Sequence, residues 1–203
     1  MIAGVVALVL AYAVVHFLFV HWWLLLLLGL AAGGGGVALW QGRRQRRARA
    51  AEQLRTLRLH LAELDALRHD GFEYAIRDLL RRDGARAERT GGAGDQGCDV
   101  RAVDPLGRVW IFQAKHRRDG LAGSAVGTPD LQRLNGTARP VHGADVVVAV
   151  TNGRFSTRAP AFAKAQRIHL VDRSLLARWA AGPHPLWQLL DKLPAPARRG
   201  LIR

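Results

Sequence analysis

Two apolar runs open the chain, and no Asp, Glu, Lys or Arg occurs before Arg43. Residues 2–19 and 22–39 each approach the ~20 apolar residues that cross ~30 Å of hydrocarbon. Histidine and tryptophan lie at the edges of these runs, and Trp is common at the membrane interface. The pattern predicts a transmembrane helical hairpin over residues 1–42. A single long span or a signal peptide are the alternatives, although the run is long for a signal peptide and no charged segment precedes it.

A basic block follows the second apolar run, at residues 43–49. By the positive-inside rule this block keeps the downstream chain, and therefore also the amino terminus, in the cytoplasm. Leucines at positions 54, 57, 61, 64 and 67 recur at helical spacing, which predicts a helix over residues 46–67. Residues 43–68 are thus expected to form a basic juxtamembrane helix or linker.

The rest of the chain alternates between helical and strand patterns. Helices are expected over residues 71–82 and 129–139, and strands over residues 85–90, 98–103, 109–115, 145–151 and 168–171. Ser156 or Thr157 is expected to cap the helix after residue 151, and Asp172 to open a helix through residue 181. These elements predict an α/β domain at residues 69–182, with helices flanking a mixed sheet, and a carboxy-terminal tail at residues 183–203.

One strand carries polar side chains on an otherwise apolar segment. Gln113 and Lys115 project from one face of the strand at residues 109–115, because successive side chains alternate faces. If the turn at residues 104–107 pairs this strand with the preceding one, Asp99 returns beside them. Asp99 and Gln113 offer anionic and neutral oxygens, both of which Mg²⁺ accepts. Lys115 can instead orient a bound water or offset charge on a phosphoryl transition state.

These residues resemble the Mrr-like restriction endonucleases of the PD-(D/E)xK nuclease superfamily. The resemblance covers roughly residues 70–181 and rests on four segments in the family's order. They are GFEYAIRDLL from Gly71, GDQGCDV from Gly94, VWIFQAK from Val109 and DVVVAVTNGRFSTRAPAFA from Asp145.

The resemblance implies an active site and a fold. Asp99 would be the active-site carboxylate, and Gln113 with Lys115 the QxK variant of the (D/E)xK pair. Glu73 would be the acidic residue from the first helix, and Asp95 also matches the motif. The implied fold is a restriction-endonuclease-like mixed sheet flanked by helices, preceded here by the transmembrane hairpin.

Simpler explanations exist for each of these residues. Asp99 and Asp95 lie in a glycine-rich turn, where Asp is a common turn former. Glu73 could form a surface ion pair with Arg77, four residues later. Gln113 stands where many relatives carry Glu, so the predicted site has one negative charge fewer and should bind its cation more weakly.

Charge and cysteine content narrow the expected partners. The net charge of +14 arises entirely after the apolar segment, which indicates a polyanionic neighbour such as nucleic acid or anionic lipid. His116, Arg117 and Arg118 extend directly from the predicted site and are expected to hold DNA phosphates, with a solvated loop as the alternative. Cys98 is the only cysteine, which excludes an internal disulfide and a structural zinc site made by this chain alone.

The sequence therefore predicts a membrane-anchored endonuclease that hydrolyses DNA phosphodiester bonds with Mg²⁺ or Mn²⁺ on the cytoplasmic side. Restriction of foreign or modified DNA is the role that the resemblance implies. DNA, membrane lipids and a second copy of the chain are the expected partners. A catalytically idle nuclease fold that serves as a tethered DNA-binding or scaffold module is the alternative, and a protein whose basic surface binds only lipid is the third.

Overall fold

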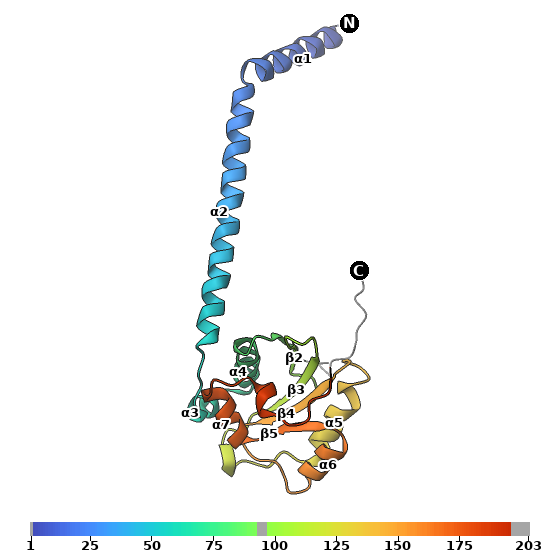
Figure 1. The fold of residues 1–203 in the computed structure, drawn as a ribbon. Helices are drawn as coiled ribbons and strands as arrows, with labels where there is room; N and C mark the ends of the chain where they lie inside the picture. The colour runs from blue at the N-terminus through green and yellow to red at the C-terminus, as the bar shows by residue number, and fades with distance from the viewer. Residues whose placement is uncertain (1, 93–96, 196–203) are drawn as a thin grey trace. The chain divides into compact units, whose positions relative to one another are not determined.

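The computed structural model describes residues 2–92 and 97–195 (Figure 1). Contacts divide the chain into two compact units, Met1–Ala50 and Ala51–Arg203. The first holds the apolar segment, and the second holds the whole of the predicted nuclease region.

The apolar segment begins with helix α1, Ile2–Val20, and a break at His21 separates it from helix α2, Trp22–Arg55. Helix α1 has 19 residues, a mean hydropathy of 2.5 and no buried residue. Among the described residues it is the one helix that is long and apolar enough to cross a membrane. The second span, at residues 22–39, stays a prediction. The basic block lies within α2, and its side chains from residue 46 onward lie outside the described part.

The prediction of one continuous helix over residues 46–67 is wrong. Helix α2 ends at Arg55, and a separate short helix, α3, covers Leu61–Ala66. Between them the Leu59 N–H donates to the carbonyl of Ala180, 3.2 Å away. Leu64 is fully buried, and four partly buried leucines pack against the same core: Leu57, Leu59, Leu61 and Leu67. Tertiary packing and this hydrogen bond outweigh the helical spacing of the leucines.

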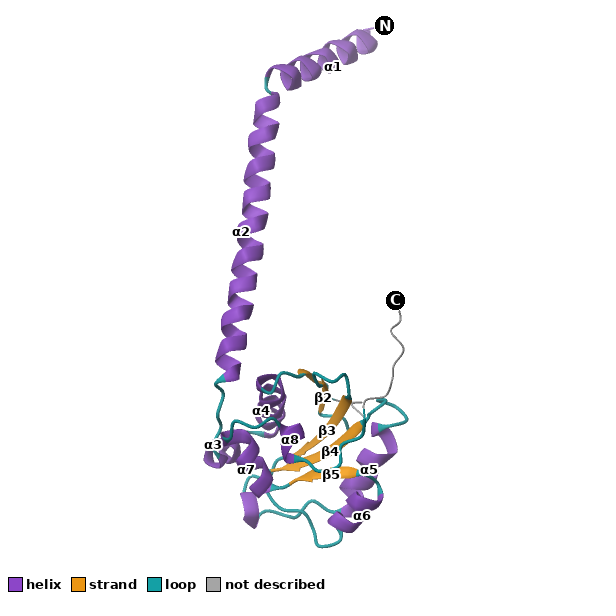
Figure 2. Ribbon diagram, viewed as in Figure 1, coloured by secondary structure: helices purple, strands orange, loops and turns teal. Residues whose placement is uncertain are grey.

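The second unit is built on a five-stranded mixed sheet in the order β1-β2-β3-β4-β5 (Figure 2). The strands are β1 Arg86–Arg89, β2 Val100–Val103, β3 Val109–Lys115, β4 Val146–Thr151 and β5 Ile168–Val171. The first three strands pair antiparallel, whereas β3, β4 and β5 run parallel. All five predicted strands are confirmed, with small differences at their ends.

Helices cover both faces of the sheet (Figures 1 and 2). One face carries α3 with α4 His69–Arg82, α7 Arg173–Ala181 and α8 Leu186–Leu189; the other carries α5 Thr128–Ala138 and α6 Ala159–Ala165. A short 3₁₀ helix, η1 Gly120–Ala122, lies between β3 and α5. The predicted helices at residues 71–82 and 129–139 correspond to α4 and α5.

Strand β3 alternates its side chains between two faces, as predicted, and each face contributes to a separate core. Trp110, Phe112 and Ala114 face the core beneath α4 and α7. Val109 and Ile111 face the core beneath α5 and α6. By this alternation Gln113 and Lys115 lie on the α5 side of the strand.

The two predicted helix caps have different outcomes. Asp172 caps α7 through a 2.9 Å hydrogen bond from the Leu175 N–H, which confirms that prediction. The cap expected at Ser156 or Thr157 is wrong, because α6 starts later, after Arg158, and has no side-chain cap. The Ser156 N–H instead bonds to the carbonyl of Val126 at 2.9 Å, which keeps this segment extended.

Part of the segment expected as a tail, residues 183–203, packs on the domain. Leu186 in α8 is fully buried. Its N–H donates to the carboxylate of Asp83 at 2.9 Å, and Trp179 Nε1 donates to the same oxygen at 2.7 Å. This shared acceptor joins α4, α7 and α8.

Candidate active site

A buried turn network fixes the hairpin that carries the candidate site. The Asp104 Oδ1 atom accepts the N–H groups of Leu106 and Arg108, each at 2.9 Å. Its Oδ2 atom accepts Arg108 Nε at 2.6 Å and Trp110 Nε1 at 2.9 Å. Gly107 adopts φ +83°, which glycine tolerates at little cost. These bonds set the register in which Val100 lies opposite Phe112, and so decide where Asp99 lies.

Asp99 lies at the start of β2, against the end of β3. Its N–H donates to the carbonyl of Phe112 at 2.9 Å, and its Oδ2 atom accepts the Ala114 N–H at 2.6 Å. Ala114 separates Gln113 from Lys115, so the carboxylate is fixed to the main chain between the two predicted partners. The side chain is well buried, with the residue 8% exposed. The predicted return of Asp99 beside this strand is therefore seen in the structure.

Gln113 is buried with an unused acceptor. The residue is 4% exposed, and among the described residues its Oε1 atom has no hydrogen-bond partner. A buried polar atom without a partner carries a desolvation cost of about 1–3 kcal/mol, and a bound cation would remove it. Gly97, at φ +81°, lies close by, since a Cβ atom on it would be 3.4 Å from Gln113 Nε2.

Lys115 ends β3 and reaches a carboxylate that sequence reasoning missed. Its Nζ atom lies 3.7 Å from Oδ1 of Asp130, in the first turn of α5, and its side chain is one-quarter exposed. Asp130 also pairs with the exposed Arg133. An acidic residue in a first helical turn is common for electrostatic reasons, so the sequence carried no signal of this contact.

Glu73 lies on the buried face of α4 and is 2% exposed. Its carboxylate pairs with Arg89 on β1 and with His69 Nε2 at 3.2 Å, whereas Arg77 pairs with Asp78. The surface pair of Glu73 with Arg77 is thus absent. A Cβ atom on Gly91 would come within 2.6 Å of Glu73 Oε2, and the Gly91 N–H donates to the Asp99 carbonyl at 3.3 Å. Gly91 therefore lies close to the Glu73 carboxylate and is hydrogen-bonded to Asp99, the residue before β2.

The three residues predicted to hold DNA differ in their surroundings. The His116 ring packs against Phe72 at 5.3 Å between centroids. Arg117 stabilises the surrounding loops, since its N–H donates to Asn152 Oδ1 at 2.6 Å and its Nε donates to the Ser124 carbonyl at 2.7 Å. Arg118 is exposed. Of the three, Arg118 has the surroundings of a phosphate contact, and the DNA-binding role of all three stays a prediction.

A polar network beside the carboxyl ends of β3 and β4 was also missed. Asn152 Nδ2 donates to Asp65 Oδ1 and to the Arg117 carbonyl, both at 2.8 Å. Arg173 donates to both Asp65 oxygens at 2.7 Å. The hydrogen bond from Arg173 outweighs burial and holds the pKa of Asp65 below its ordinary value of 3.8. An Asn-Gly pair such as residues 152–153 is a common turn signal and points to no further role, and the partners Asp65 and Arg173 are distant in sequence.

The donor set limits the kind of metal site that is possible. Among the described residues no group of three or more His, Cys, Asp or Glu side chains could hold a metal ion. One carboxylate and one amide, as in Asp99 and Gln113, form a weaker set that suits an oxygen-preferring cation. The unpartnered Gln113 Oε1 fits such a cation. Asp95, whose role the sequence left open, lies outside the described residues.

Comparison with known proteins identifies the family. The family model Mrr_cat, described as restriction endonuclease, matches residues 64–180, which is more than half of the chain. The chain belongs to this restriction endonuclease family. The family's catalytic domain is a nuclease domain, and the mixed five-stranded sheet with flanking helices is restriction-endonuclease-like. No curated protein matches the chain.

Two solved structures are similar to the fold. A protein of unknown function, AF1548, is 19% identical, with a TM-score of 0.47, and the match covers 60% of this chain and 66% of that one. The MspJI restriction endonuclease, solved in complex with a 27-mer oligonucleotide, is 24% identical, with a TM-score of 0.39. That match covers 66% of this chain and 34% of MspJI. The chain thus spans about a third of MspJI and about two thirds of AF1548.

Proposed function

We propose that this protein is a metal-dependent DNA endonuclease that acts on foreign or modified DNA. The observation that carries the proposal is the buried, unpartnered Oε1 atom of Gln113 beside a carboxylate that the main chain of β3 fixes. Membership in the restriction endonuclease family supports the same reaction.

The side chains have separable roles in this proposal. Asp99 and Gln113 would hold a Mg²⁺ or Mn²⁺ ion through one anionic and one neutral oxygen. Such an ion, when bound, polarises a phosphoryl oxygen and lowers the pKa of a bound water. Lys115 would offset negative charge that develops on the phosphate, with its ammonium aimed from the end of β3. Glu73 lies close to Gly91, which is hydrogen-bonded to the Asp99 main chain, and would complete the acidic side of the site.

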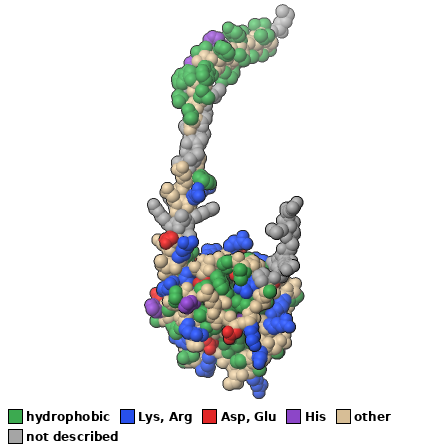
Figure 3. All heavy atoms as spheres, viewed as in Figure 1, with side chains coloured by type: hydrophobic (Ala, Val, Ile, Leu, Met, Phe, Trp, Pro, Cys, Tyr) green, Lys and Arg blue, Asp and Glu red, His purple; other side chains and the backbone are tan. Residues whose placement is uncertain are grey.

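Charge supports nucleic acid as the substrate class. Lys and Arg together number 30 against 16 Asp and Glu, and basic side chains are spread over the visible face of the domain in Figure 3. A surface of this sign attracts the phosphate backbone whatever its base sequence. Binding that depends on the backbone in this way suits an enzyme with weak sequence preference.

Asp99→Asn tests the chemistry. The amide keeps an oxygen that can accept the Ala114 N–H but loses the negative charge, so DNA cleavage with Mg²⁺ or Mn²⁺ should be lost while DNA binding and folding remain. Asp119→Asn, at an exposed aspartate in the loop after β3, is the matched control and should cleave normally. Cleavage by Asp99→Asn at the unmodified rate would refute the assignment. DNA binding by the unmodified chain without cleavage under either ion would favour the idle DNA-binding module.

We further propose that residues 1–42 cross a membrane twice and leave the nuclease domain in the cytoplasm, with the basic block beside anionic lipid. The apolar surface of α1 supports the first span (Figure 3). A reporter active only outside the cytoplasm should be silent when fused after Arg203 and active when fused after His21. An active fusion at Arg203 would place the domain outside the cytoplasm and remove its access to intracellular DNA.

A further inference from the structure

A cavity lined by several charged residues lies at the amino-terminal ends of β4 and β5, the opposite end of the strands from the candidate active site. Its volume is about 360 Å³, and its lining includes Asp145 just before β4 and Ile168 at the start of β5. Lys115, in contrast, lies opposite Thr151 at the carboxyl end of β4. The six residues of β4, at ~3.3 Å each, place its two ends about 17–20 Å apart. A molecule bound in this cavity would therefore lie too far from Lys115 to be the substrate of the proposed nuclease site.

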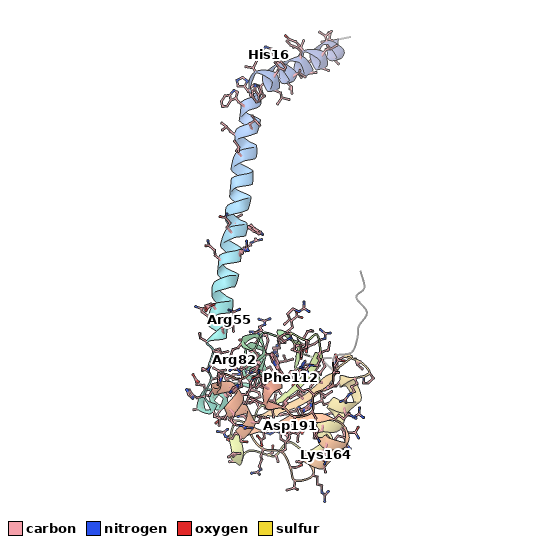
Figure 4. All side chains as sticks on the ribbon, in the orientation of Figure 1. His16, Arg55, Arg82, Phe112, Lys164 and Asp191 are labelled. Atoms are coloured by element: carbon pink, nitrogen blue, oxygen red, sulfur yellow. The ribbon has the colours of Figure 1, made fainter. Side chains whose placement is uncertain are left out.

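The cavity gathers four cations from three parts of the chain. Arg139 follows α5, Lys164 lies in the last turn of α6, Arg167 precedes β5 and Lys192 lies beyond α8. Figure 4 labels Lys164 together with Asp191, another lining residue. Two lining aspartates, Asp145 and Asp191, oppose the four cations, which leaves two positive charges in excess. One of the aspartates is engaged elsewhere, because Asp145 Oδ2 accepts the Val109 N–H at 2.7 Å.

Most of these cations have no partner of their own. The side chains of Lys164, Arg167 and Lys192 make no hydrogen bond or ion pair among the described residues. Arg139 Nη2 donates to the Arg167 carbonyl at 3.0 Å, which holds the two arginines side by side. Burial and the neighbouring charge of Arg167 lower the pKa of Arg139. An anion between them would relieve this repulsion.

The backbone gives an independent indication. Within the described part of the chain, the two non-glycine residues with positive φ are Arg167 at 53° and Lys192 at 55°, and both line this cavity. Glycine adopts this conformation at lower cost than a residue with a Cβ atom. The preference of helix ends for basic residues explains Lys164, but it does not explain a long cation where glycine would be more stable. A ligand held by the side chains of Arg167 and Lys192 would offset this cost.

We propose that this cavity binds a small organic phosphate of about nucleotide size. A phosphate monoester carries nearly two negative charges, which matches the excess positive charge, and guanidinium groups bind phosphate through paired N–H donors. The volume lies at the small end of the range for ligand sites, about 300–1,000 Å³. Ala163, Ile168 and Pro194 add apolar lining against which a base or another apolar group can pack. This site is separate from the proposed nuclease centre and does not depend on its activity.

Titration of the full-length protein with AMP and with inorganic phosphate tests the proposal. EDTA is present throughout, so that binding through a metal at Asp99 and Gln113 is suppressed. AMP should bind saturably and more tightly than inorganic phosphate. Arg167→Gly and Lys192→Gly should each weaken AMP binding about tenfold or more, the loss expected for one charge-assisted hydrogen bond. Because glycine suits the left-handed backbone, neither variant should have a lower melting temperature.

Arg86→Ala is the matched control, since it removes an exposed cation of β1 that does not line the cavity. It should change AMP affinity less than twofold. An equal loss in Arg86→Ala and Arg167→Gly would show attraction by overall charge alone and would overturn the proposal, as would the absence of saturable AMP binding. Equal affinities for AMP and inorganic phosphate would overturn the assigned ligand size. DNA cleavage measured in parallel should be unchanged in Arg167→Gly.

Discussion

Gln113→Glu is a sharp test of the proposed cation site, because the change should destabilise the protein when no cation is present and increase the stabilisation that an added cation provides. The substitution nearly preserves shape and replaces the unpartnered Oε1 amide with a carboxyl group. Gln113 is 4% exposed, and Asp99 is hydrogen-bonded to the adjacent main chain of the same strand. Without a cation, a second carboxylate in this position is buried and close to one of like charge.

The size of the effect follows from the cost of keeping the introduced carboxyl neutral. An unperturbed glutamate has a pKa of about 4.3, so holding it protonated at pH 7 costs about 3.7 kcal/mol at 1.36 kcal/mol per pH unit. Ionisation in a buried site costs several kcal/mol as well, so the destabilisation should approach but not exceed about 4 kcal/mol. Burial raises the pKa of the introduced group in the folded state. Its cost therefore grows as the pH rises from about 4.3 towards that raised pKa, and at pH 5 it shrinks to about 1 kcal/mol.

Urea unfolding of the full chain measures this directly, at pH 5 and pH 7 and with EDTA or Mg²⁺. In EDTA at pH 7 the variant should be several kcal/mol less stable than the unmodified protein. Mg²⁺ should stabilise the variant more than the unmodified protein, since any ligand at 100 times its Kd adds about 2.7 kcal/mol and the variant should have the lower Kd. Gln132→Glu, at an exposed position of α5, is the control and should change stability by no more than about 0.5 kcal/mol. Equal effects of Mg²⁺ on the two proteins would refute coordination by Gln113.

Three further predictions follow from the contacts around the site. Lys115→Ala should lower the DNA cleavage rate about 100-fold, the typical loss for one transition-state donor, and Lys115→Arg should restore only part of it; full activity with Arg would mean that the residue only steers substrate. Asp104→Ala should cost about 3–5 kcal/mol in urea unfolding because it leaves Arg108 buried without its partner; a loss below 1 kcal/mol would contradict this. The lowered pKa of Asp65 means that its ion pair with Arg173 stabilises the fold above pH 3.8 and is lost as the pH falls through the depressed pKa, so Asp65→Asn should flatten the acid limb of the stability curve.

Local pattern was sufficient to predict the strands and the position of Asp99 beside the strand that carries Gln113 and Lys115. The alternation along residues 109–115 placed Gln113 and Lys115 on one face, and the turn at residues 104–107 gave the hairpin that returns Asp99. Both signals act over fewer than twenty residues. The turn is reinforced by a carboxylate that accepts four hydrogen bonds from its own hairpin, so the local sequence and the final register agree.

Contacts between distant segments account for what the sequence did not reveal. The leucine-spaced stretch leaves the helix after Arg55 because Leu59 bonds to Ala180, more than a hundred residues away. Glu73 pairs with Arg89 on β1 in place of Arg77 one turn away. Asp130 meets Lys115 only because α5 follows β3 and packs beside it. In each case a residue contacts a partner that is distant in sequence and not the nearby residue that helical or strand spacing favours. No local sequence pattern indicates such contacts.

The way in which Asp99 and Gln113 are held also decides how the proposed cation site would respond to loss of a cation. Asp99 is fixed by a main-chain hydrogen bond to Ala114, and Gln113 by burial in the strand next to it. Neither position depends on a bound ion, because the hairpin register is set by the Asp104 turn. Removal of the cation should therefore leave the fold intact, and the only loss of stability should be the desolvation cost of the Gln113 Oε1 atom, which then has no partner. A neutral amide keeps that cost small, at about 1–3 kcal/mol, whereas a carboxylate would make it larger. Under the proposed function, the glutamine would therefore weaken cation binding but let the metal-free protein stay folded.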